Sequence, residues 1–140
     1  MKECIINFSL FNWWPVIVAT LSGYFLGAIW YSNATFGKVW MRIQGLKEED
    51  LAKGWLSAML ITFITTFLTA IVLQIIIIGI GVKMPGQAIM IGILIGLFIV
   101  AGNMLSENLY SRRPLKFWLI TAGYRFIMIL LMAVIMGLWI

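Results

Sequence analysis

Four long apolar runs dominate this chain, and they constrain its fold more than any other feature. An α-helix needs about 20 apolar residues to cross the hydrocarbon core of a bilayer, which is roughly 30 Å thick. The apolar runs of this chain meet that length and occupy residues 13–32, 56–80, 88–110 and 115–139. The sequence therefore predicts an all-α integral membrane protein, with four transmembrane helices in a single domain of residues 1–140.

The composition supports this prediction and argues against other classes. Hydrophobic residues make up 63% of the chain and charged residues 11%, too few for the surface of a soluble domain. Stretches such as AIVLQIIIIGI are apolar on every face and lack the period of two that marks a transmembrane strand. A cleaved signal peptide is the alternative for the first run, but no A-x-A-like site follows it, so we expect a retained helix.

Histidine is absent from the chain and cysteine occurs once, which limits the catalytic and metal sites that it can form. The chain has no histidine and a single cysteine, Cys4, so the common zinc, copper and haem ligand sets and an internal disulfide cannot be assembled from one chain. No serine lies in a nucleophile elbow, and no glycine-rich phosphate loop follows a strand. We therefore expect no enzyme activity, no catalytic residue, no metal and no cofactor.

Basic residues are distributed unevenly between the two sides of the predicted membrane helices. Two loops hold seven of them, and the other side holds only Lys2 and Lys83. The positive-inside rule then predicts that both basic loops are cytoplasmic and that both termini lie outside the cell (inner) membrane. The net charge of +5 predicts attraction to anionic lipids at the cytoplasmic face rather than binding of nucleic acid. The seven residues are Lys38, Arg42, Lys47, Lys53, Arg112, Arg113 and Lys116.

A short amphipathic segment connects the first two apolar runs. Its apolar side chains recur at helical spacing between Phe36 and Leu46, with Lys38 and Arg42 on a different face. This pattern predicts a short interfacial helix at about residues 36–46, with a mobile gate as the alternative. Aromatic and basic side chains near the predicted interfaces are expected to anchor the protein and contact lipid head groups. These are Trp30, Tyr31, Lys38, Trp40, Arg42, Arg112 and Arg113.

Glycines and polar residues recur along the third run at intervals of three or four. They are Gly92, Gly96, Asn103 and Glu107, so we expect two glycines and two polar side chains to share one helix face. The first run has a similar pair, Gly23 and Gly27. Small residues four apart allow helix backbones to approach closely in lipid, which predicts helix packing at all four glycines, with a pore lining as the alternative.

An ionisable residue inside the fourth run is costly unless it has a partner. Arg125 lies about 15 Å from the start of its predicted helix, and Glu107 lies about 5 Å from the end of the preceding one, at 1.5 Å per residue. Because side chains lean toward a helix's N-terminus, these two reach toward each other. We predict an intramembrane polar cluster of Asn103, Glu107, Tyr124 and Arg125 with a Glu107–Arg125 ion pair, which could be a structural clamp or a working site.

Both ends of the chain resemble one family. The stretches NWWPVIVATLSGYFLGAIWYSNATFGKVWM and SRRPLKFWLITAGYRFIMILLMAVIMGLW resemble the beginning and the end of an uncharacterised bacterial membrane-protein family, domain of unknown function 1761. The chain departs from the family pattern at Asn33, where proline is common, and at Arg125, where histidine is common. The resemblance implies a small four-helix membrane protein and no particular activity. It rests on Asn12, Trp13, Gly27, Trp30, Tyr31, Ser32, Phe36, Gly37, Lys38, Trp40, Met41, Arg113, Ala122, Gly123, Tyr124, Gly137 and Trp139.

Two functional hypotheses follow from the sequence. The first is a channel- or transporter-like role for a small solute or ion, along a path lined by Asn103, Glu107 and Arg125. Four helices enclose little space, so this role requires a homo-oligomer. The second is a structural or accessory subunit of a larger membrane complex, without transport or catalysis of its own. We expect the first, and the mass of the particle in detergent or native lipid discs distinguishes the two.

Overall fold

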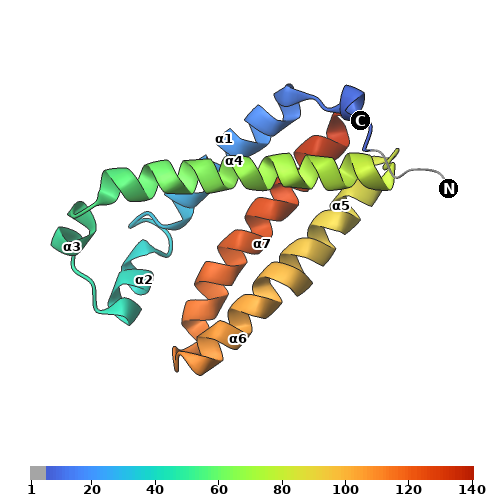
Figure 1. The fold of residues 1–140 in the computed structure, drawn as a ribbon. Helices are drawn as coiled ribbons and strands as arrows, with labels where there is room; N and C mark the ends of the chain where they lie inside the picture. Colours follow the sequence, from blue (N-terminus) through green and yellow to red (C-terminus); the bar gives the residue numbers. More distant parts are fainter. Residues whose placement is uncertain (1–5) are drawn as a thin grey trace.

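The computed structural model describes residues 6–140, and in that range it contains helices and turns but no strand (Figure 1). Lys2 and Cys4 lie outside the described residues. Four helical spans are long and apolar enough to cross a membrane, which confirms the predicted all-α membrane fold. The spans are Trp13–Trp30, Trp55–Ile80, Pro85–Tyr110 and Leu115–Leu138.

Nine elements make up the described chain, and the third span contains three of them. The spans α1 (Trp13–Trp30), α4 (Trp55–Ile80) and α7 (Leu115–Leu138) are regular helices. The third span consists of α5 (Pro85–Ile93), a π-helical segment η2 (Leu94–Ala101) and α6 (Gly102–Tyr110). The shorter elements are η1 (Phe8–Leu10), α2 (Gly37–Gln44) and α3 (Glu48–Ala52).

Local capping explains where the first two spans begin and end. The side chain of Asn12 accepts a hydrogen bond from the Trp14 amide at 3.0 Å, which satisfies a free donor at the start of α1. The helix ends at Trp30, before the expected residue 32, because the Thr35 hydroxyl donates to the Trp30 carbonyl at 2.6 Å and closes a turn there. Gly81 ends α4 in the left-handed conformation, with φ of 76°.

Helix α7 lies at the centre of the bundle and is the most buried of the four spans. It packs against α1 on one side and runs beside α5 and α6 on the other, while α4 crosses them and lies along α1 (Figure 1). Met128 and Met132 of α7 fill the core together with Val16 of α1 and Thr66 of α4. Only the C-terminal part of α4, from Thr66 onward, has buried residues, and its N-terminal part is exposed.

The four glycines at which the sequence predicts helix packing all lie against α7. A Cβ atom added to Gly92 would lie 2.5 Å from the Cβ of Ala133, and one added to Gly23 would lie 2.9 Å from the Cε of Met132. Added Cβ atoms at Gly27 and Gly96 would similarly meet the rings of Tyr124 and Phe126 at 2.7 Å and 3.0 Å. These glycines therefore allow α1 and α5 to approach α7 more closely than any larger residue would.

The π-helical segment changes which residues of the third span face the bundle. The buried positions are Ala88, Gly92, Gly96, Ala101 and Asn108, so the spacing of four is interrupted by a step of five within η2. A π-helical turn contains about one residue more than an α-helical turn, and this extra residue shifts the buried face. Beyond η2 the buried positions are therefore Ala101 and Asn108, whereas Asn103 and Glu107, which were predicted to share a face with the glycines, are exposed.

Candidate functional site

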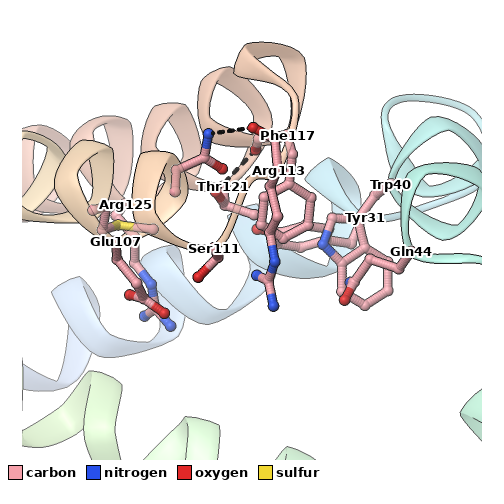
Figure 2. A pocket seen from close by; sticks show the side chains of 11 residues that line it. Tyr31, Trp40, Gln44, Glu107, Ser111, Arg113, Phe117, Thr121 and Arg125 are labelled. Carbon is pink, nitrogen blue, oxygen red and sulfur yellow. Dashed lines mark hydrogen bonds between the residues drawn. The ribbon is translucent and has the colours of Figure 1, made fainter.

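A polar cavity opens at the end of the bundle that carries Arg112, Arg113 and Lys116, which we call the basic end (Figure 2). Its volume is about 330 Å³. Three parts of the chain line it: α2 with the turn before it, the end of α6 with the turn after it, and the first half of α7. The lining residues are Tyr31, Trp40, Gln44, Met104, Glu107, Asn108, Ser111, Arg113, Phe117, Thr121 and Arg125.

A tight turn between α1 and α2 builds the aromatic wall of the cavity. The Gly37 amide donates to the Ser32 carbonyl at 3.0 Å, and the Phe36 amide donates to the Trp30 carbonyl at 3.1 Å. A Cβ atom at position 37 would lie 2.2 Å from the Tyr31 carbonyl oxygen, so the turn requires glycine. This turn brings the rings of Tyr31 and Trp40 together with centroids 5.5 Å apart.

Several predicted lipid anchors face the protein instead. The indole Nε1 of Trp30 donates to the Ile120 carbonyl of α7 at 3.0 Å, and the Tyr31 ring contacts the Tyr124 ring at 5.4 Å. Trp40 is half-buried at the cavity. These three aromatic residues therefore also have contacts within the protein, and their anchoring role in lipid stays a prediction. The basic members of the set, Lys38, Arg42, Arg112 and Arg113, are exposed.

Tyr124 and Arg125 connect the core to the cavity. The Tyr124 hydroxyl donates to the Gly23 carbonyl of α1 at 3.2 Å, which places this side chain behind the cavity rather than beside Glu107. The guanidinium carbon of Arg125 lies 5.5 Å from the centroid of the Tyr124 ring, a cation–π distance. Arg125 is thus held partly buried against an aromatic face while its head group lines the cavity.

Glu107 and Arg125 line the same cavity, and their side chains reach the same side of it (Figure 2). Within the described part of the chain, no Glu107 carboxylate oxygen lies within 4.0 Å of an Arg125 side-chain nitrogen, so the two form no direct ion pair. Asn103 does not line the cavity. Its side-chain amide donates to the Ile99 carbonyl of the same span. Of the four residues in the predicted polar cluster, the structure therefore brings two into the cavity and places Tyr124 behind it.

Asn108 is a cavity residue that the sequence analysis missed. It is only 5% exposed, and its Nδ2 donates to the carbonyls of Arg113 at 3.1 Å and Pro114 at 3.4 Å. Its Oδ1 is buried and has no hydrogen-bond partner. The signal in the sequence was its place just before the SRRP turn, where asparagine side chains commonly bond to nearby backbone.

The turn that follows Asn108 positions the second guanidinium of the cavity. The Arg113 amide donates to the Asn108 carbonyl at 3.1 Å, and Arg112 has a left-handed φ of 54°, a geometry typical of a Schellman turn. The guanidinium carbon of Arg113 lies 4.6 Å from the centroid of the Phe117 ring. The cavity is therefore lined by two arginines and one glutamate, and the buried carboxamide of Asn108 lies in its wall.

Comparison with known proteins gives one match. The family model described as protein of unknown function (DUF1761) matches residues 14–137, which is nearly the whole chain. The chain belongs to this family. No curated protein and no solved structure matches it.

Positions from both ends of the DUF1761 resemblance meet beside the cavity. Trp30 and Gly37 come from the first stretch and Tyr124 from the second, and all three take part in the contacts described above. Gly123 adds to them, because a Cβ atom there would lie 3.4 Å from the Trp30 ring. In this DUF1761 chain, Arg125, one of the two positions at which the sequence departs from the expected pattern, lines the cavity itself.

Proposed function

We propose that this DUF1761 chain has a transporter-like role for a small polar solute or ion and works as a homo-oligomer. The observation that carries the proposal is the polar cavity with Arg125 in its wall. Ionisable residues within membrane spans are costly, and they typically face water-filled cavities and mark the path of a solute or ion. The proposal assigns the cavity to binding and passage, with no catalytic step.

The direct test is uptake by proteoliposomes that contain the full chain. We use radiolabelled glycine and radiolabelled inorganic phosphate as probes, because both carry an anionic group that Arg125 can bind. The wild-type protein is expected to give saturable uptake of at least one probe, and Arg125→Gln should reduce that uptake at least tenfold. Lys116→Gln is the matched control, since Lys116 is exposed at the same end and does not line the cavity. Uptake equal to that of protein-free vesicles would contradict the proposal.

Oligomeric state separates the transporter from the second candidate, an accessory subunit. The observation that favours the second candidate is the exposed N-terminal part of α4, including Trp55, Leu60 and Ile64, which no other part of the described chain covers. The mass of the particle extracted in native lipid discs decides between them. A symmetric assembly of this chain supports transport, whereas co-purification with unrelated subunits supports the accessory role.

We also propose that the basic end is cytoplasmic and that both termini are outside, on the basis of the distribution of lysine and arginine. Cysteine introduced at Lys47 or Arg112, after replacement of Cys4, should then resist an impermeant thiol reagent in intact cells. Cysteine introduced at Lys83 should react and serves as the matched control. Labelling of both Lys47 and Arg112 from outside would invert the topology.

A further inference from the structure

The cavity at the basic end presents charges of both signs. Arg113 and Arg125, which carry guanidinium groups, and Glu107, which carries a carboxylate, all line this cavity of about 330 Å³. A purely anionic ligand would leave the carboxylate facing its negative charge, and a purely cationic ligand would face two guanidinium groups. A ligand that carries one charge of each sign is complementary to all three side chains.

Asn108 fixes the wall of the cavity next to these charges. Its Nδ2 donates to two backbone carbonyls, those of Arg113 and Pro114, and carbonyls can only accept hydrogen bonds. The carboxamide therefore cannot exchange its oxygen and nitrogen, and the buried Oδ1 remains the group without a partner. This oxygen has no surface open to the cavity, so Asn108 is part of the wall, and the charged side chains are the groups that meet a ligand.

The size and walls of the cavity limit the ligand to a small molecule or a head group. A volume of about 330 Å³ is at the lower end of the range of about 300–1,000 Å³ found for small-molecule sites. Tyr31 and Trp40 form one wall, and the ring of Phe117 is already covered by the Arg113 guanidinium at 4.6 Å. The space between these walls fits a small ligand whose polar groups are joined by a short carbon chain.

We infer that the cavity binds a zwitterion in which a short chain joins a primary ammonium to an anionic group. The anion lies against Arg113 and Arg125, and the ammonium donates hydrogen bonds to the Glu107 carboxylate. The inference rests on the proposed function, because it names the ligand class of the same cavity. Two sources supply this chemistry: a soluble zwitterion such as an amino acid, or the head group of a phosphatidylethanolamine lipid.

The first arm of the test measures soluble zwitterions on the full chain in detergent by isothermal titration calorimetry. Phosphoethanolamine and phosphocholine differ only in the ammonium, which has N–H donors in the first and none in the second. We expect phosphoethanolamine to bind at least tenfold more tightly than phosphocholine or inorganic phosphate. Glycine is expected to exceed acetate by a similar factor.

The second arm measures the lipid source. The protein is extracted from lipid discs that contain equal amounts of phosphatidylethanolamine and phosphatidylcholine, and the lipids retained on it are counted by native mass spectrometry. A severalfold excess of retained phosphatidylethanolamine identifies the head group as the ligand. A preference found only with phosphoethanolamine or glycine identifies a soluble ligand, and either result supports the inference.

Variants of the cavity complete the test. Glu107 is exposed, so Glu107→Gln preserves the fold, and it should abolish the preference for the primary ammonium while leaving weak binding of phosphate. Lys116→Gln is the control and should keep the preference. The inference is overturned if wild-type protein shows no preference in either arm, or if Glu107→Gln retains it.

The outcomes also separate this inference from the proposed function. A primary-ammonium preference without uptake by proteoliposomes would refute transport and leave the ligand class standing. Uptake of phosphate without that preference would support transport and refute the ligand class.

Discussion

The two halves of the hairpin formed by the third span and α7 differ in how closely their helices pack. Near the start of α5, a Cβ atom added to Gly137 would lie 3.1 Å from the Cα of Pro85, and Gly92 lies directly against Ala133. Beyond η2, the same pair of helices is lined by Glu107, Phe117 and other large or polar side chains and opens into the cavity. Small residues allow close contact between the helices in one half of the hairpin, the closed half. In the other half, the open half, large or polar side chains lie between the helices.

The largest expected effect comes from a substitution in the closed half of the hairpin. Gly92→Leu should lower the free energy of unfolding by about 1–3 kcal/mol, because overpacking of a tight contact displaces backbone and side chains. The measurement is unfolding in detergent followed by circular dichroism. Gly86→Leu is the matched control, since an added Cβ there meets nothing within 4 Å, and equal losses in both variants would contradict the close packing.

The second prediction weakens the hydrogen bond that joins α7 to α1 behind the cavity. Tyr124→Phe removes the donor to the Gly23 carbonyl and should lower the free energy of unfolding by about 1 kcal/mol. The same unfolding assay measures it. Tyr110→Phe should change nothing, because Tyr110 is 92% exposed. An unchanged stability for Tyr124→Phe would show that this bond does not hold the open half together.

The third prediction concerns the turn at Arg112, which joins α6 to α7 at the open half of the hairpin. Arg112 has a left-handed φ of 54°, a conformation that costs a non-glycine residue about 1 kcal/mol. Arg112→Gly should therefore raise the free energy of unfolding by about 0.5 kcal/mol after the greater entropy of glycine in the unfolded chain is counted. Lys116→Gly, in the first turn of α7, is expected to lower stability instead. A loss of stability in Arg112→Gly would contradict the geometry of this turn.

The fourth prediction tests whether the two charges of the cavity interact. Glu107 and Arg125 share the cavity without a direct ion pair, so we expect a coupling free energy of about 0.5 kcal/mol in a double-mutant cycle of Glu107→Ala and Arg125→Ala. Each variant is compared by unfolding in detergent. Strict additivity would show that the two residues are independent, and a much larger value would indicate a direct pair.

The sequence was sufficient for the fold because length and apolarity alone decide which segments can span a bilayer. It also identified Glu107 and Arg125, since a charge in an apolar run is conspicuous. It failed at Asn103 and Asn108, because their positions depend on the π-helical step, and apolar residues such as Leu97 and Ile99 give no local sign of that step. The contacts of Trp30 and Tyr31 with α7 were not predicted, because an interfacial aromatic residue looks the same in the sequence whether it faces lipid or a neighbouring helix.

The π-helical segment η2 has a consequence for changes in chain length. In a regular α-helix, deletion of one residue rotates everything beyond it by about 100° and would turn Asn108 out of the cavity. In η2, deletion of a single residue between Leu97 and Val100 instead lets the wide turn relax to an ordinary one, with Ala101 and Asn108 still facing α7. The third span should therefore tolerate a one-residue deletion there and not within α5, so natural length variation in this helix is expected to concentrate at η2.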